Sequence, residues 1–392
     1  MTDSTNLAQF ELLKRVRDAQ PVLERVRESG ETELHMQKQL RREFPDDVVR
    51  AAFALDELRR RAVGKFSRAA EMWFDRKGLQ QATAEAVALH KAQRFEGLVW
   101  DYCAGIGGDS AALAQRCEVL AVDNAPSACL RTAWNAEAYS VESRVRPICA
   151  DVQELTDRSG MVHLDPDRRA RGAGRSVRLE QSVPPLEFME RVMREFAGGA
   201  IKLSPAANFF GKFPAAEIEL VSLGGECKEA TVWFGELATP GLWRATSLPA
   251  GVSLAGDPLE FVSEVGPLGG YLHDPDSAVV RAGLLDRACA ELGLQRLDLE
   301  EEYLTSDAPV DSPFVRSFRV LAELPNNDRQ IRAYFRNSEI GHVEVKCRRI
   351  PIRAEEVLRK LPRPGGAPAV LIFARLAGKS RAVVCTRVAA DN

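Results

Sequence analysis

A glycine-rich segment preceded by an acidic residue is the strongest chemical signal in the sequence. Asp101 closes an apolar run and is followed by Cys103-Ala104-Gly105-Ile106-Gly107-Gly108-Asp109. Glycines let a backbone turn sharply and approach a ligand closely, and a helix that begins there offers its N-terminal N–H groups. The spacing therefore predicts a strand, a ligand-binding loop and a helix.

Acidic residues recur at the ends of the next three strand-like runs. Asp123 ends the second run, Asp151 the third, and Asp165-Pro166 the fourth. The carboxyl ends of parallel strands share one edge of a sheet, which is where open α/β sheets bind ligands. At that edge the Asp123 carboxylate would accept both hydroxyls of a ribose, and Asp151 would accept from an adenine amine.

The loop favours S-adenosylmethionine over a dinucleotide. In the Gly-x-Gly-x-x-Gly pattern of dinucleotide-binding loops, Ser110 stands in the place of the third glycine, and an acidic residue, Asp101, precedes the loop. A nicotinamide enzyme and a purely structural loop stay open as alternatives. The predicted cofactor-binding residues are Asp101, Cys103, Gly105, Gly107, Gly108, Asp109, Asp123, Asn124, Asp151 and Val152.

The segment after the fourth run predicts the type of methyl transfer. Enzymes that methylate the amino group of a base carry Asp, Asn or Ser followed by Pro-Pro-aromatic, which accepts from the amine and stacks on the base. This sequence keeps Asp165-Pro166 but has Asp167 and Arg168 in the last two places, so stacking would fall to the planar guanidinium. The predicted catalytic residues are Asp165, Pro166, Asp167 and Arg168.

Basic and polar residues beside this segment are candidates for substrate contacts. They are Arg169, Arg171, Arg175, Lys202 and Ser204. Guanidinium groups bind phosphate through two parallel hydrogen bonds, although arginines in a loop also pair with nearby glutamates. The fifth strand ends in Lys-Leu-Ser-Pro without the cysteine that methylation of pyrimidine C5 requires, which argues against that chemistry.

Periodicity places these residues in an α/β fold, with a Rossmann-like doubly wound methyltransferase core. We predict a helical N-terminal module over 1–94, in which 79–95 is one helix, and the core over 95–256. Two small α+β modules follow, over 257–325 and 326–392, with a single helix over 277–292.

Composition excludes several other classes of protein. The chain has 392 residues, 45% hydrophobic and 28% charged, which is typical of a soluble globular protein, and no apolar run is long enough to cross a bilayer. The N-terminus lacks a signal-peptide pattern. Because its eight cysteines lie at least twelve residues apart and its five histidines form no ligand spacing, we predict reduced thiols, no metal and a cytoplasmic location.

Charge is distributed unevenly along the chain. From Arg329 to Asn392, 14 Lys and Arg residues face 5 Asp and Glu residues, so this part carries +9 and the first 328 residues carry −12 of the total −3. A basic module on an acidic body predicts a polyanionic partner such as a nucleic acid; an ordinary solvated surface is the alternative. We predict that removing 326–392 weakens RNA binding and spares cofactor binding.

The sequence resembles the bacterial class I S-adenosylmethionine-dependent methyltransferases that end in a THUMP-like domain. The resemblance rests on DYCAGIGGDS, VLAVDNAP, HLDPDRRARGAGR, IKLSPAANF, YLHDPDSAVVRAG, GHVEVKCRRIP and PAVLIFARL, and it spans about 70–392. It implies a Rossmann-like core, a ferredoxin-like module at 257–325, a THUMP-like domain at 326–392 and an RNA partner. The core is also distantly similar to trimethylguanosine synthase, whose loop has a similar Cys-x-Gly-x-Gly-Gly pattern.

These observations predict an S-adenosylmethionine-dependent methyltransferase that acts on RNA by direct in-line transfer to a base nitrogen. Two alternatives remain. One is a methyltransferase of a small molecule or a protein, and the other is a non-catalytic protein that binds both the cofactor and RNA.

Overall fold

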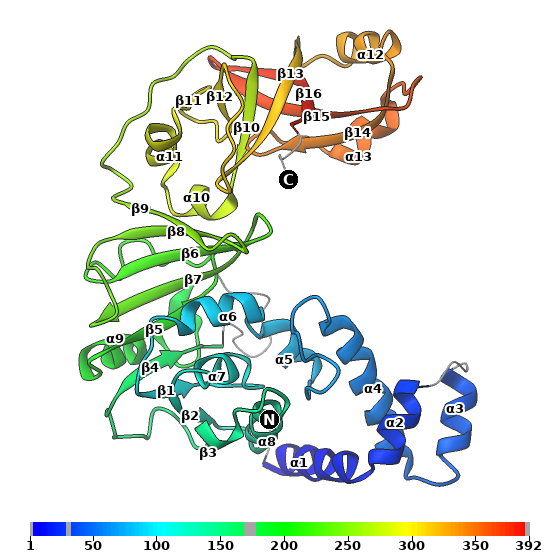
Figure 1. Cartoon of the computed structure of the whole chain (residues 1–392), viewed down its shortest axis with the longest axis vertical. Helices are drawn as coiled ribbons and strands as arrows, with labels where there is room; N and C mark the ends of the chain where they lie inside the picture. Colours follow the sequence, from blue (N-terminus) through cyan, green and yellow to red (C-terminus); the bar gives the residue numbers. More distant parts are fainter. Residues whose placement is uncertain (1–2, 29–32, 168–177, 389–392) are drawn as a thin grey trace. The chain divides into compact units, whose positions relative to one another are not determined.

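The computed structural model describes residues 3–28, 33–167 and 178–388 (Figure 1). By its internal contacts the chain divides into two compact units. The first comprises Met1–Glu217 and Glu229–Pro240, and the second comprises Ile218–Lys228 and Gly241–Asn392. Within the described ranges, no helix is both long and apolar enough to cross a membrane.

The first unit begins with six helices. They are α1 (Asp3–Asp18), α2 (Gln20–Glu28), α3 (Glu33–Leu40), α4 (Asp46–Ala62), α5 (Arg76–Gln81) and α6 (Glu85–Ala92). The apolar faces of α1 to α5 share one core that includes Trp134 of the sheet-bearing part, and the rings of Trp73 and Trp134 lie 4.7 Å apart; α6 packs in a second cluster through Ala88 and Ala92. The helical module therefore packs directly on the sheet-bearing part of its own unit.

The predicted helix over 79–95 is two helices, because the chain is extended between them. Ala82 and Ala84 both have ψ near 140°, which is outside the helical region. Between them, the Thr83 hydroxyl donates to Asp109 Oδ2 at 2.7 Å and to Glu229 Oε2 at 3.2 Å. Tertiary hydrogen bonds thus override the local helical preference.

The sheet of the first unit has the strand order β3-β2-β1-β4-β5-β7. Its elements are β1 (Leu98–Tyr102), α7 (Gly108–Leu113), β2 (Glu118–Asp123), α8 (Pro126–Ala138), β3 (Val145–Cys149), β4 (Met161–Leu164), α9 (Leu186–Glu195), β5 (Gly198–Leu203) and β7 (Glu226–Gly235), with 3₁₀ turns at Glu142–Arg144 and Leu179–Gln181. All neighbouring strands are parallel except β5 and β7. The order reverses between β1 and β4, which is the point where such sheets bind ligands. The doubly wound core is confirmed.

The second unit contains two groups of strands. In the first, β6 (Glu217–Leu223) pairs in parallel with β8 (Trp243–Leu248), and β9 (Val252–Gly256) is antiparallel to β8. The sequence analysis assigns these strands to the core over 95–256, and that boundary stays a prediction.

The second group is a seven-stranded sheet in the order β11-β12-β10-β13-β16-β15-β14. Its elements are β10 (Tyr271–Pro275), α10 (Ser277–Arg281), α11 (Leu285–Leu292), β11 (Gln295–Arg296), β12 (Leu304–Ser306), β13 (Val315–Pro325), α12 (Asp328–Arg336), β14 (Ile340–Cys347), α13 (Ala354–Lys360), β15 (Ala367–Leu376) and β16 (Lys379–Arg387). Strands from both sides of residue 325 share this sheet. The single helix predicted over 277–292 is divided at Gly283, whose φ of +72° is outside the helical region.

Alternation along β15 sends neighbouring side chains to opposite faces of that sheet. Val370 and Ile372 belong to one apolar cluster, while Leu371 and Phe373 belong to another. The second cluster contains Phe335 of α12 and, near α13, Val357 and Leu361. Both helices therefore cover the same face of the sheet.

Candidate active site

The loop between β1 and α7 has the conformation that its glycines predict. Gly105 and Gly107 have φ of +60° and +77°, and Cys103 adopts φ of +63° although it is not glycine. A Cβ added to Gly107 would lie 2.9 Å from the Thr132 Cα on α8, so only glycine fits there. At Gly105 the nearest atom to such a Cβ is the Cys103 oxygen, 4.0 Å away, so the loop has open space on that side.

The predicted ribose and adenine ligands follow β2 and β3. Asp123 is half-buried, and its two carboxylate oxygens accept from the N–H groups of Gly105 and Ala125, each at 2.9 Å. Burial raises the pKa of this carboxyl. Asp151 is also half-buried and accepts from the Gln153 N–H at 2.9 Å. Of their predicted neighbours, Asn124 is exposed and Val152 is buried.

Asp101 lies deeper than the other strand-end carboxylates. It is fully buried, and parallel pairing of β1 with β4 places it opposite His163. The Ser110 hydroxyl donates to its Oδ2, and His163 Nδ1 lies 2.7 Å from its Oδ1. Since a carboxylate only accepts, Nδ1 carries the proton. Asp101 thus links β4 to the helix that follows the loop.

Asp165 is the first of five charged side chains of alternating sign that form a chain of ion pairs. Lys202 Nζ lies 2.5 Å from Asp165 Oδ2 and 3.8 Å from Asp109 Oδ2. Lys91 Nζ lies 3.0 Å from Asp109 Oδ1 and 2.8 Å from Glu229 Oε1. We call Asp165, Lys202, Asp109, Lys91 and Glu229 the buried charge chain; its members come from five elements or loops of the first unit.

Burial and neighbouring charges set the protonation of this chain. Desolvation opposes the charged form of Asp109, yet Lys91 and Lys202 outweigh it and hold the pKa of Asp109 far below its usual range. Desolvation also acts on both lysines, but the neighbouring carboxylates raise their pKa values. Asp165 is different, because burial raises its pKa despite the ammonium of Lys202. Its side chain is also the most exposed of the five, at 24%.

The two oxygens of Asp165 differ in their hydrogen bonds to the described residues. Oδ2 accepts from Lys202, whose ammonium also donates to the backbone oxygen of Gln81 at 3.2 Å. Among the residues that the structure describes, no donor is assigned to Asp165 Oδ1. Pro166 follows directly and is buried. This carboxylate can therefore accept a hydrogen bond from a ligand without giving up its internal partner.

The remaining predicted residues have varied surroundings. Asp167 accepts from Lys77 Nζ at 2.6 Å and from Gln81 Nε2 at 3.0 Å, while its backbone pairs with Val183. Ser204 is half-buried and its hydroxyl accepts from the Ala206 N–H. The predicted residues Arg168, Arg169, Arg171 and Arg175 lie outside the described residues.

Sequence reasoning missed four polar groups that complete the site: Thr83, Lys91, Gln81 and Glu229. Lys91 and Glu229 are 2% and 3% exposed, respectively. Each stands beside apolar residues, in Ala-Leu-His-Lys-Ala and Glu-Ala-Thr-Val-Trp. A charge inside an apolar stretch indicates a buried ion pair, so the signal was present, but the sequence does not say which two charges meet.

The residues at the sheet edge fit a positively charged adenosine-containing ligand. Burial raises the pKa of the Cys103 thiol, and four carboxylates raise it further: Asp123, Asp165, Asp101 and Asp151. All four strand-end acids therefore act on one loop position, beside the open space at Gly105. S-adenosylmethionine carries a sulfonium and an ammonium group, which such an edge favours. The described residues contain no group of three His, Cys, Asp or Glu arranged to hold a metal ion.

Comparison with known proteins supports this interpretation. Residues 96–172 match the family of RNA cap guanine-N2 methyltransferases, and residues 315–387 match the THUMP domain-like family. The chain is similar in fold to a crystal structure from Porphyromonas gingivalis W83, named as a methyltransferase candidate, with a TM-score of 0.76 over 100% of both chains and 17% identity.

Two relatives from Mycobacterium tuberculosis, strains CDC 1551 / Oshkosh and H37Rv, are 32% identical over 336 residues. The alignment covers 82% of this chain and 92% of each relative, and both are named as uncharacterized S-adenosylmethionine-dependent methyltransferases. Together with the THUMP-like C-terminal domain and the doubly wound sheet, this similarity shows that the chain belongs to the S-adenosylmethionine-dependent methyltransferases.

Proposed function

We propose that this methyltransferase modifies RNA at a base nitrogen. The observation that carries the proposal is Asp165 Oδ1, which has no assigned donor among the described residues and lies at the carboxyl end of β4 beside the switch point of the sheet. An exocyclic amine has N–H groups that such an oxygen can accept. The matches to an RNA cap guanine-N2 methyltransferase family and a THUMP domain-like family support RNA as the substrate class.

The cofactor site in this proposal uses the sheet edge. Asp123 receives the ribose hydroxyls, Asp151 receives the adenine amine, and the loop from Cys103 to Gly108 holds the methionine end. Asp101 acts through that loop, because its oxygens already accept from Ser110 and His163. When bound, S-adenosylmethionine supplies an electrophilic methyl group.

Asp165 then orients the acceptor. Its Oδ1 accepts an N–H of the amine, which directs the nitrogen lone pair, and it takes up the proton that the nitrogen loses when its bond to the methyl carbon forms. Lys202 holds the other oxygen, so the carboxylate does not rotate, and Gln81 fixes the lysine in turn. Positioning of this kind is the main contribution that the protein makes to a direct transfer.

Label transfer tests the proposal. The protein is incubated with methyl-labelled S-adenosylmethionine and total RNA from cells that lack its gene, with RNA from normal cells as the control. We expect label only in RNA from the deletion cells, and an Asp165→Ala variant should lower the rate by about 100-fold or more. Asp157→Ala, an exposed carboxylate in a loop that precedes β4, serves as the matched control.

Calorimetry with S-adenosylhomocysteine separates catalysis from cofactor binding. Asp165→Ala should bind it as the unmodified protein does. Absence of label in either RNA, with normal binding of S-adenosylhomocysteine, would contradict an RNA substrate. It would shift the choice to a small-molecule or protein acceptor, or to a binding role without catalysis.

A further inference from the structure

The basic side chains of residues 329–392 fall into two groups according to their ion pairs. In the part of the chain that the structure describes, most of them lie within 4.0 Å of an acidic side chain. These paired residues are Lys346, Arg348, Arg349, Arg353, Lys360, Arg375, Arg381 and Arg387. Their charges are compensated inside the molecule.

The second group has no such partner among residues 3–28, 33–167 and 178–388. Apart from Lys379, all of its members lie on α12, on α13 or just after α13, and all are exposed. We call five of them the arginine face: Arg329, Arg332, Arg336, Arg359 and Arg363. Within the described ranges, no ion pair or ring contact is assigned to any of these five guanidinium groups.

Helical geometry places three of these arginines on one side of α12. Arg329, Arg332 and Arg336 are separated by three and four residues, so they form a row along the helix. Ile331 and Phe335 point into the apolar cluster under the helix. The row therefore lies away from the buried side, along a helix length of about 10 Å.

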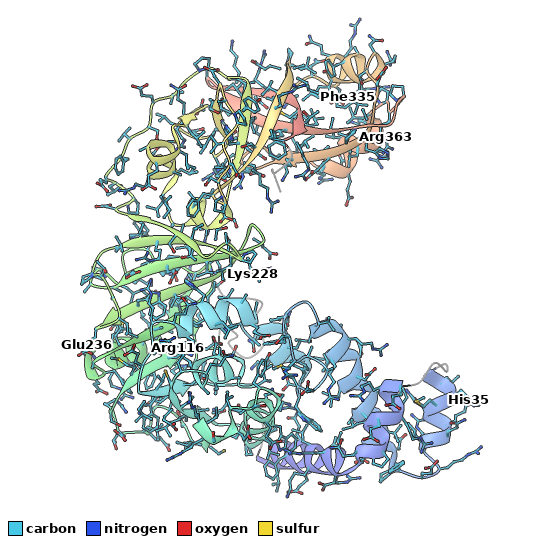
Figure 2. All side chains as sticks on the ribbon, in the orientation of Figure 1. His35, Arg116, Lys228, Glu236, Phe335 and Arg363 are labelled. Carbon is cyan, nitrogen blue, oxygen red and sulfur yellow. The ribbon has the colours of Figure 1, made fainter. Side chains whose placement is uncertain are left out.

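The two arginines at α13 lie next to this row. Lys360 Nζ at the end of α13 lies 3.2 Å from Asp328 Oδ2 at the start of α12. Leu361 packs in the same cluster as Ile331 and Phe335. Figure 2 shows Arg363 at the same end of the C-terminal domain as Phe335. The five exposed arginines therefore lie on or just after two helices whose ends meet at the Asp328–Lys360 pair.

Five exposed guanidinium groups of one sign repel one another, and no described carboxylate lies within 4.0 Å of any of them. Such a surface is complementary to an extended anion. Phosphate oxygens match the geometry of guanidinium N–H groups, which donate two parallel hydrogen bonds, and the planar group can also stack on a base. A row of arginines on a helix with further arginines beside it thus suits a chain of phosphates better than a single small anion.

We propose that the arginine face is the docking surface for the phosphate backbone of the RNA substrate. This inference rests on the proposed function, and it selects five residues from a domain whose other basic side chains are mostly engaged internally. Removing residues 326–392 is unsuitable as a test, because β16 pairs with β13 and the deletion would expose the core of the shared sheet. Point variants of the full chain are required.

Two triple variants of equal charge provide the test. The first is Arg329→Ala/Arg332→Ala/Arg336→Ala, and the second is Arg349→Ala/Arg353→Ala/Arg387→Ala, in which all three removed side chains are exposed and ion-paired. Binding of fluorescein-labelled single-stranded RNA of mixed sequence is measured over a range of salt concentrations. Thermal melting and calorimetry with S-adenosylhomocysteine confirm that each variant is folded and binds the cofactor.

We expect the first variant to weaken RNA binding by at least about tenfold and to lower the slope of log K against log salt by about 2. The second variant should keep the slope of the unmodified protein. Equal weakening by both variants would overturn the proposal, because net charge alone would then explain binding. Unchanged binding by the first variant would also overturn it while leaving the proposed function intact, whereas an unmodified protein that neither binds nor methylates RNA would reject both.

Discussion

Charged side chains differ in burial and in ion pairing between two regions of this molecule. In the buried charge chain each lysine lies between two carboxylates, and four of its five members are less than 10% exposed as side chains. On the arginine face the guanidinium groups are exposed and have no acidic partner among the described residues. The first arrangement fixes a geometry, and the second leaves charge available for something outside the chain.

Burial changes how strongly salt and the loss of a partner affect a charge. Buried pairs are screened little by salt, and the loss of one partner leaves a desolvated charge without compensation. Exposed charges are screened strongly and contribute little to stability when they are removed. Variants in the two regions should therefore differ in which property they change: stability and pH dependence in the first, and salt-dependent binding in the second.

The largest effect on stability is expected from Lys91→Met. This change removes one ammonium, and with it the ion pairs that Asp109 and Glu229 make with Lys91 in a buried site, at an expected cost of about 3–5 kcal/mol. Urea unfolding followed by tryptophan fluorescence measures it, because all tryptophans except Trp243 lie in the first unit.

The matched control is Arg353→Met, which breaks an exposed pair with Glu356 and should cost less than about 1 kcal/mol. If Lys91→Met cost no more than this control, the chain of buried pairs would not act as a unit, and the contrast between the two regions would fail.

Asp123→Ala should weaken cofactor binding by about 10-fold to 100-fold, since hydrogen bonds to a half-buried carboxylate contribute about 1.5–3 kcal/mol. The same change also removes the acceptor of the Gly105 and Ala125 N–H groups, so the loop loses part of its support. Calorimetry with S-adenosylhomocysteine measures the affinity. Unchanged affinity would reject the ribose assignment.

Lys202→Met should change the pH dependence of methyl transfer. The pKa of Asp165 is raised by burial and lowered by Lys202, while His163 lowers it and Asp109 raises it. Without the lysine, the pKa of Asp165 rises further. As the pH is lowered, the carboxylate that accepts the amine N–H is therefore protonated at a higher pH than in the unmodified protein. The acidic limb of the pH–rate profile should therefore move to higher pH, with a fall of about tenfold in kcat.

Lys202→Arg serves as the control for that change, because it keeps a positive charge beside Asp165 and should leave the limb near its original position. A substrate contact by Lys202 would instead raise KM in both variants without moving the limb.

The sequence was most informative about the acidic residues at the ends of the predicted strands. Asp101, Asp123, Asp151 and Asp165 were placed on one sheet edge from spacing alone, and the structure has them at or just after the carboxyl ends of β1, β2, β3 and β4. This worked because parallel strands joined by helices have only one common carboxyl edge.

Contacts between distant segments could not be predicted in the same way. Lys91, Asp109 and Glu229 are separated by 18 and 120 residues, and nothing in the periodicity indicates that they meet. The same limit applies to the C-terminal charge. Its excess was visible in the sequence, but the division into paired and unpaired arginines depends on acids such as Glu302, which precedes them in the chain.

The smallest predicted effect is that of a single arginine on RNA binding. It tests whether the position of a positive charge matters, or only the total charge. Arg332 and Lys379 are both exposed and without an ion pair among the described residues, but Arg332 lies on α12 and Lys379 is the first residue of β16. Arg332 is in the middle of the row on α12, whereas the turn before Lys379 is bound to Leu297 and Asp298 through the N–H groups of Ala377 and Gly378. Arg332→Ala should lower the salt slope of RNA binding by about 0.7, and Lys379→Ala should leave it unchanged. Equal effects would mean that RNA senses only the overall charge, so the arginine face would lose its distinction from the rest of the surface.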